Sequence, residues 1–146
     1  MLKRQFYGLM TVIIGLALVF SFIACDNGNG DNGNSGDGRI SGWPNSSTLS
    51  SYGISGLTKP NDATNVIYFD APSTVVSGDT VLSVYFTGTT ASLNTIRTWF
   101  DNQNDWTKSG SNYRKTSGNV SYSTLIQESS GIEGRNCVLM ITKRGN

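Results

Sequence analysis

The sequence contains no histidine and only two cysteines in 146 residues. Without histidine, a Ser-His-Asp triad, a Cys-His pair and a His-ligated zinc are all excluded. Two cysteines do not supply a Cys₄ metal site, and they form at most one disulfide. Charged residues make up only 14% of the sequence. They are also nearly balanced, since 11 Lys and Arg and 10 Asp and Glu give a net charge of +1. This balance lacks the basic excess that drives binding to a phosphate backbone, so we expect no nucleic-acid partner.

The first 24 residues are typical of a targeting segment. Lys3 and Arg4 form a short cationic start, and the 19 residues from 6 to 24 carry no charge. A basic start, an apolar run and a small residue at its end are the three parts of a secretory signal. Because about 20 apolar residues cross a bilayer, an uncleaved membrane anchor is the alternative interpretation of the same segment.

The apolar run ends in the tetrapeptide Phe22-Ile23-Ala24-Cys25. It resembles the lipobox of bacterial lipoproteins, usually Leu-(Ala/Ser/Thr/Val/Ile)-(Gly/Ala/Ser)-Cys, in the looser form that spirochaete lipoproteins, among others, tolerate. The resemblance implies that Cys25 receives a diacylglyceryl thioether and that the chain is cut before it. Two acyl chains hold a protein stably to a membrane where one chain does not. We therefore expect a lipid-anchored, palmitate-type lipoprotein of the cell envelope that faces the periplasm or the exterior, with the choice between inner and outer membrane left open.

Residues 26–38 read DNGNGDNGNSGDG, which contains only Asp, Asn, Gly and Ser. Such a segment buries no apolar area that would offset the entropy of ordering it. Together with Cys25 it predicts a disordered tether over residues 25–38. At about 5–6 Å times the square root of its length, the run reaches roughly 20 Å between membrane and folded domain.

The remaining chain, 39–146, is long enough for one domain with a small core. Alternating apolar and β-branched residues predict strands, which we place at residues 65–69, 81–87, 113–116, 120–126 and 137–142. Apolar residues at helical spacing between Leu93 and Phe100 predict an amphipathic helix over 91–103. The order of these elements predicts an α+β fold, with a small, mostly antiparallel sheet of about five strands covered by one helix.

Three aromatic residues are candidates for a ligand or partner surface. Trp43, Trp106 and Tyr113 lie near Asn and Ser residues. Rings stack on sugars or peptides while amides and hydroxyls form hydrogen bonds with them, so this combination is typical of such recognition. The alternative, which we favour for Trp43, is that the segment 41–57 folds as an N-terminal cap on the core.

A catalytic role would rest on carboxylates, and glycoside hydrolases hold two of them about 5–10 Å apart. Asp70 and Asp101 are the pair to test, although solvated acids in turns are far commoner.

Cys137 lies in the most apolar strand, and a free cysteine there is expected to be a buried core residue. Two basic pairs, Arg114-Lys115 and Lys143-Arg144, have two possible roles. They meet anionic lipid headgroups or an acidic partner, or they are plain solvated positions.

The sequence therefore predicts a lipid-anchored extracytoplasmic protein whose domain has a binding or envelope-structural role and is not an enzyme. The expected partners are the membrane, through acylated Cys25, and an envelope glycan or protein. We expect no cofactor and no metal. Two alternatives stay open, a small His-free hydrolase that uses carboxylates and an uncleaved signal-anchored membrane protein.

Overall fold

The computed structural model of the chain describes residues 38–73, 78–129 and 132–145. The signal segment, the lipobox with Cys25 and the tether up to Asp37 lie outside the described residues. Among the helices of the described part, none has the length and apolar character that a bilayer crossing requires.

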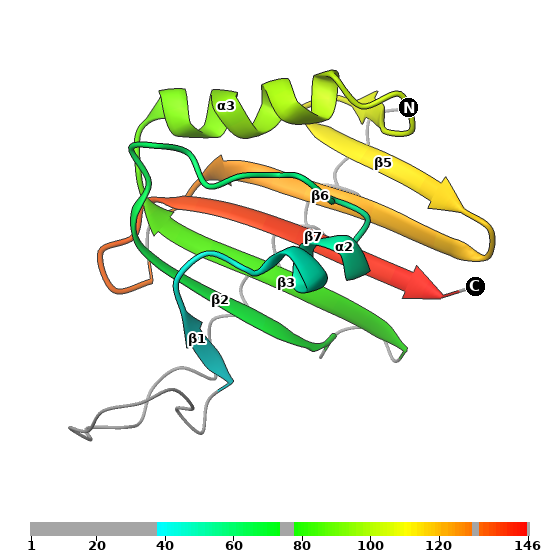
Figure 1. Ribbon diagram of the computed structural model, residues 1–146, viewed down its shortest axis with the longest axis horizontal. Helices are drawn as coiled ribbons and strands as arrows, with labels where there is room; N and C mark the ends of the chain where they lie inside the picture. The colour runs from blue at the N-terminus through cyan, green and yellow to red at the C-terminus, as the bar shows by residue number, and fades with distance from the viewer. Residues whose placement is uncertain (1–37, 74–77, 130–131, 146) are drawn as a thin grey trace, which may run out of the picture.

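Seven strands form one antiparallel sheet (Figure 1). In chain order they are β1 (Arg39–Ser41), β2 (Thr64–Pro72), β3 (Asp79–Thr87), β4 (Thr107–Ser109), β5 (Asn112–Ser117), β6 (Val120–Glu128) and β7 (Cys137–Gly145). Across the sheet their order is β1-β2-β3-β7-β6-β5-β4. The most apolar strand, β7, is therefore central, because it joins the β1–β3 half of the sheet to the hairpins of β4, β5 and β6.

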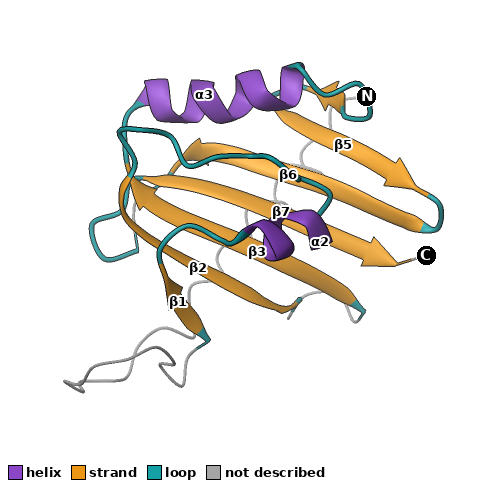
Figure 2. Cartoon of the chain, in the orientation of Figure 1, coloured by secondary structure: helices purple, strands orange, loops and turns teal. Residues whose placement is uncertain are grey.

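Two helices, α2 (Ser46–Ser51) and α3 (Thr90–Asp101), cover the same face of this sheet (Figure 2). The predicted α+β class is confirmed, and so is the amphipathic helix, whose Leu93, Ile96 and Phe100 are buried. The predicted number of strands, about five, is wrong. The two additional strands, β1 and β4, are three-residue strands at the two edges of the sheet, too short to show an alternating pattern.

The start of α3 is fixed by a hydrogen-bonded network around Asp62. One oxygen of this carboxylate accepts hydrogen bonds from the hydroxyls of Thr89 and Ser92, each at 2.7 Å, and the Thr89 N–H donates to Ser92 Oγ at 2.8 Å. These two hydroxyl donors hold the pKa of Asp62 below its usual range. A Cβ at Gly88 would come within 2.6 Å of Ser92 Oγ, so only glycine fits between β3 and this network.

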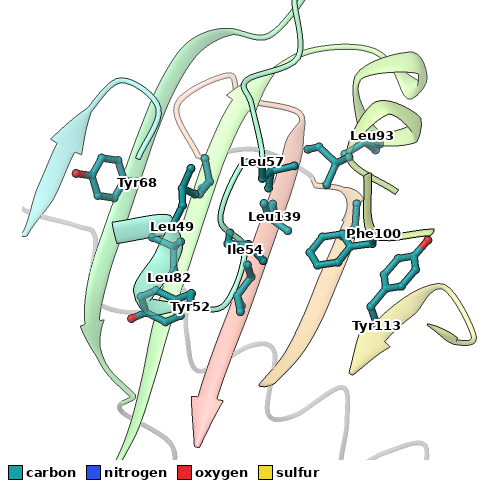
Figure 3. Packing of buried hydrophobic residues seen from close by; sticks show 14 of the residues in the cluster. Leu49, Tyr52, Ile54, Leu57, Tyr68, Leu82, Leu93, Phe100, Tyr113 and Leu139 are labelled. Atoms are coloured by element: carbon teal, nitrogen blue, oxygen red, sulfur yellow. The ribbon is translucent and has the colours of Figure 1, made fainter. Parts of the chain in front are cut away.

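The main core lies between the sheet and the two helices (Figure 3). Alternate residues of the central strands point into it, among them Leu82, Val84, Leu139 and Ile141. Cys137 also belongs to this core and is fully buried, as the sequence predicted. Burial raises the pKa of its thiol, which keeps the sulfur protonated and unreactive at neutral pH.

The other face of the sheet carries a smaller cluster, made of Ile67, Tyr85, Ile132 and Val138. Ile132 comes from the loop between β6 and β7 and packs over the three strand residues. The two apolar faces explain the consecutive apolar residues in the middle of β2, residues 66–69, and at the start of β7, residues 137–141, since strand segments buried on both faces do not alternate.

Candidate functional site

A polar depression of about 380 Å³ lies on the helix-covered face of the sheet. It is formed where the segment after α2, the end of α3 and the β5–β6 hairpin come together, and we refer to it as the polar depression. The side chains that matter for its chemistry are Ser50, Trp99, Gln103, Asp105, Lys115 and Tyr122.

Lys115 of β5 is held in one position at the base of the polar depression. Its ammonium group forms an ion pair with Asp105 at 2.5 Å and donates to the Gly53 carbonyl at 3.5 Å. It also lies 5.8 Å from the centre of the Trp106 ring, a cation–π contact. Because only 16% of the Lys115 side chain is exposed whereas 58% of Asp105 is, the carboxylate is the more accessible half of the pair.

Gly53, together with Lys115, forms the bottom of the polar depression. Its backbone has φ +70°, a left-handed conformation that favours glycine, and directs its carbonyl oxygen toward two donors. These donors are Lys115 Nζ and the indole N–H of Trp106, the latter at 3.3 Å. A single backbone carbonyl thus connects the segment after α2 to the β4–β5 region and fixes the shape of the depression.

Two half-buried aromatic rings, Trp99 and Tyr122, form the walls. Trp99 packs edge-on against Phe100 with 5.0 Å between ring centres, which fixes its orientation. Gln103 follows one turn later and donates to the Trp99 carbonyl at 3.2 Å through one of its amide hydrogens. The Gln103 amide keeps one N–H donor and its oxygen acceptor for a ligand. Together with the Lys115–Asp105 ion pair and the two rings, these positions suit a ligand that has both hydroxyl groups and apolar faces.

The three rings predicted as a ligand surface are not brought together on the surface. Trp106 and Tyr113 are 6% and 1% exposed, and both pack against Phe100, with ring centres 4.8 and 4.9 Å away. Trp43 packs edge-on against Phe86 at 6.3 Å. The reason is that α3 and the segment after α2 close over these rings, so they stabilise the core.

The cap interpretation agrees with this placement. Leu49, Tyr52 and Leu57 of the segment 41–57 are all buried in the main core. Trp106 keeps a supporting role, because its ring lies beside Tyr122 at 6.2 Å and under the Lys115 ammonium.

The sequence-based prediction named Lys115 only as part of a basic pair and did not predict the polar depression as a site, although one signal points to it. Gly118 and Asn119 form a two-residue turn, since Ser117 pairs with Val120. This register places Lys115 directly opposite Tyr122 on the helix-covered face. Identifying the turn precisely would therefore have brought these two residues together from the sequence alone.

Asp70 and Asp101, the carboxylates expected to be tested as a catalytic pair, are far apart. Asp70 is on β2, whereas Asp101 ends α3 and bonds Tyr113 of β5 at 2.9 Å. Three strands, β3, β7 and β6, separate β2 from β5, which at about 4.8 Å per strand is roughly 19 Å. Hydrogen bonds from Tyr113 and Lys108 also lower the pKa of Asp101, which keeps it ionised and unsuited to act as a general acid.

The described residues contain no group of three or more His, Cys, Asp and Glu side chains that could hold a metal ion. Comparisons of the chain with models of known protein families, with curated proteins and with solved structures found no match. The functional argument therefore rests on the residues of this chain.

Proposed function

We propose that this chain is a lipid-anchored lipoprotein of the cell envelope that carries a small binding domain on a short tether. The observation that carries the proposal is the order of segments, in which a signal-like run ends in Phe22-Ile23-Ala24-Cys25 and a run of Asp, Asn, Gly and Ser follows. The first strand of the described residues, β1, starts at Arg39, directly after that run. This is the arrangement that a membrane-held domain needs, since the tether gives it room to turn toward a partner.

The polar depression supports binding as the role of the domain. Its Lys115 ammonium is preorganised by three contacts, and the rings of Trp99 and Tyr122 flank it. A preorganised site binds a ligand without the entropy loss of ordering its side chains. Hydroxyl-rich ligands such as envelope glycans match this mixture of ring faces, amide and ion pair better than purely apolar ligands do.

Acylation at Cys25 is tested by growth with a palmitate analogue followed by detection of label on the protein. We expect label on the wild-type chain and none on Cys25→Ser, because the thioether needs the sulfur of this residue. Cys137→Ala is the matched control, since it removes the other cysteine, which is buried, and should leave the label in place.

Equal label on Cys25→Ser and the wild type would contradict the lipoprotein proposal. Absence of label from all three chains, with the protein still held in the membrane, would instead favour the uncleaved signal anchor.

Ligand binding is tested by retention of the purified full chain on immobilised peptidoglycan and other envelope glycans. We expect Gln103→Ala to weaken retention about three- to tenfold, the loss of one or two hydrogen bonds worth about 0.5–1.5 kcal/mol each. Gln127→Ala is the matched control, because Gln127 lies on β6 with its side chain on the opposite face.

Equal retention of Gln103→Ala and wild type would exclude the polar depression as the glycan site. Turnover of a glycan that is lost in Asp70→Asn or Asp101→Asn would favour the hydrolase over a binding role.

A further inference from the structure

The fold brings together two basic pairs that are far apart in sequence. Arg114-Lys115 lies on β5 and Lys143-Arg144 on β7, and β6 runs between them. Lys115 and Lys143 both pair with Tyr122 of β6, so the four residues meet at one end of the sheet. Side chains alternate along a strand, so the lysines share the helix-covered face while Arg114 and Arg144 share the opposite face.

Four hydroxyl groups lie between the two arginines on that opposite face. In the strand register, Arg114 of β5 pairs with Ser123 of β6, which pairs with Thr142 of β7. Two residues along the strands, Arg144 of β7 pairs with Ser121 of β6, which pairs with Thr116 of β5. These six side chains, which we call the arginine face, line a depression of about 420 Å³ that Lys115 and Tyr122 also border. In the part of the chain that the structure describes, none of the four hydroxyls has a hydrogen-bond partner. Each of them is therefore available to donate and to accept a hydrogen bond.

The charge of the arginine face is only partly balanced. Arg144 is fixed by Asp79, whose two oxygens accept hydrogen bonds from Nε and Nη2 at 2.9–3.2 Å. Asp79 is buried, whereas 54% of the Arg144 side chain is exposed, which leaves the outer edge of the guanidinium available. Arg114 has no such carboxylate among the described residues. The ion pair of the neighbouring Lys115 with Asp105 is on the helix-covered side of β5.

The cations that have no ion pair or hydrogen bond lie close together in the sheet. Within residues 38–73, 78–129 and 132–145, every Lys and Arg has an ion pair or a hydrogen bond except Arg114 and Lys143. Both belong to the basic pairs that flank β6. Among the described residues, the two cations without a partner thus lie at the same end of the sheet, on either side of β6.

We propose that the arginine face binds a phosphate group. The two arginines are two strands apart and offset by two residues, so their Cα atoms lie roughly 12 Å apart, a span that two long side chains cover from both sides. Phosphate oxygens accept hydrogen bonds, and the arginine face offers donors to them: the guanidinium of Arg114, the exposed edge of Arg144 and four hydroxyls. A phosphate has more acceptor oxygens than a carboxylate, so the hydroxyls donate to those oxygens that the guanidinium groups do not engage. The phosphate is either a free anion or part of an anionic lipid headgroup, and neither source requires acylation of Cys25.

The test is a titration of the ¹⁵N-labelled full chain in dodecyl maltoside micelles with inorganic phosphate, at an ionic strength held constant with chloride. We expect saturable shifts of the amide signals of Ser121, Ser123 and Thr142. Arg114→Gln should raise the half-saturating concentration at least tenfold, because it removes the unpaired guanidinium. Lys108→Gln, which removes one positive charge from β4, should leave that concentration within twofold of the wild type.

A second arm replaces inorganic phosphate by phosphatidylglycerol added to the same micelles. Shifts with lipid alone identify a headgroup as the source of the phosphate, and shifts with inorganic phosphate identify a free anion; each outcome supports the proposal. Absence of shifts in both arms, or Arg114→Gln that binds as the wild type does, overturns it. Acylation is read out separately by the label on Cys25, so either proposal can fail without the other.

Discussion

Replacing Phe100 by alanine is expected to lower the free energy of unfolding by about 4 kcal/mol, since Phe→Ala changes in cores cost about 3–5 kcal/mol. Phe100 is fully buried and is the centre of an aromatic cluster. Its ring stacks on Tyr113 with 4.9 Å between centres and meets Trp106 and Trp99 edge-on at 4.8 and 5.0 Å. Removing it leaves a cavity between α3 and β5 and deprives three rings of their packing partner.

This loss is measured by urea unfolding of the full chain followed by tryptophan fluorescence. Thr98→Ala is the matched control, because Thr98 is an exposed residue of the same helix and its replacement should change stability by less than about 0.5 kcal/mol. Phe100→Leu keeps most of the apolar volume and should lose about half as much as Phe100→Ala. A loss below about 2 kcal/mol for Phe100→Ala would mean that the cluster collapses around the gap or that Phe100 is not its centre.

The parts of the fold that the sequence predicted are those in which periodicity and burial agree. The period-2 alternation of Leu82, Val84 and Phe86 identified β3 and its inward face, and the helical spacing from Leu93 to Phe100 identified α3. The short edge strands β1 and β4 were missed because three residues do not establish a period. Their strand geometry comes from pairing with β2 and β5, which is a property of the folded sheet.

The candidate site was harder to predict, because exposure depends on which segments cover a face. Trp106 looked like a loop aromatic available to a ligand, yet it is buried under the segment after α2, whose Gly53 carbonyl accepts its indole N–H. Trp99 is half-buried at the end of α3, where it packs against the core and also forms a wall of the polar depression. Local patterns state which residues share a face, but not where a non-periodic loop will lie over it.

The two proposed sites share the strands β5 and β6 and use opposite faces of them. Lys115 and Tyr122 border both depressions, whereas Gln103 lines only the polar depression and Arg114 lines only the depression of the arginine face. The alternation of side chains along one hairpin therefore separates a paired cation on one side from an unpaired cation on the other. Substitutions at Gln103 and Arg114 should consequently affect binding of the two ligand classes independently.

Replacing Arg135 by glutamine is expected to lower the free energy of unfolding by about 3 kcal/mol, since hydrogen bonds to charged groups contribute about 1.5–3 kcal/mol and unpaired buried acceptors add to the loss. The Arg135 side chain is only 7% exposed. It donates to the Asn65 carbonyl at 2.6 Å and side-chain oxygen at 2.9 Å, to the Ile132 carbonyl at 3.2 Å and to Glu133 at 2.8 Å.

These contacts hold two backbone segments in conformations that they do not favour alone. Asn65 has φ +48° at the register shift between Thr64 and Ile67 of β2, and Glu133 has φ +54° in the loop before β7. The Arg135 guanidinium, together with Arg39, also lowers the pKa of Glu133, which keeps this carboxylate ionised as its partner. Without the guanidinium, the strained loop loses its anchor, and Ile132 loses its position over the smaller apolar cluster.

Urea unfolding of the full chain measures this effect, with Arg114→Gln as the matched control because it removes an unpaired guanidinium and should change stability by less than about 0.5 kcal/mol. Arg135→Lys keeps the charge but not the planar set of donors, so it should lie between Arg135→Gln and the wild type. Equal losses for Arg135→Gln and Arg114→Gln would show that the Arg135 contacts do not stabilise the fold. Equal losses for Arg135→Lys and Arg135→Gln would show instead that the geometry of the guanidinium, and not its charge, holds the β6–β7 loop against β2.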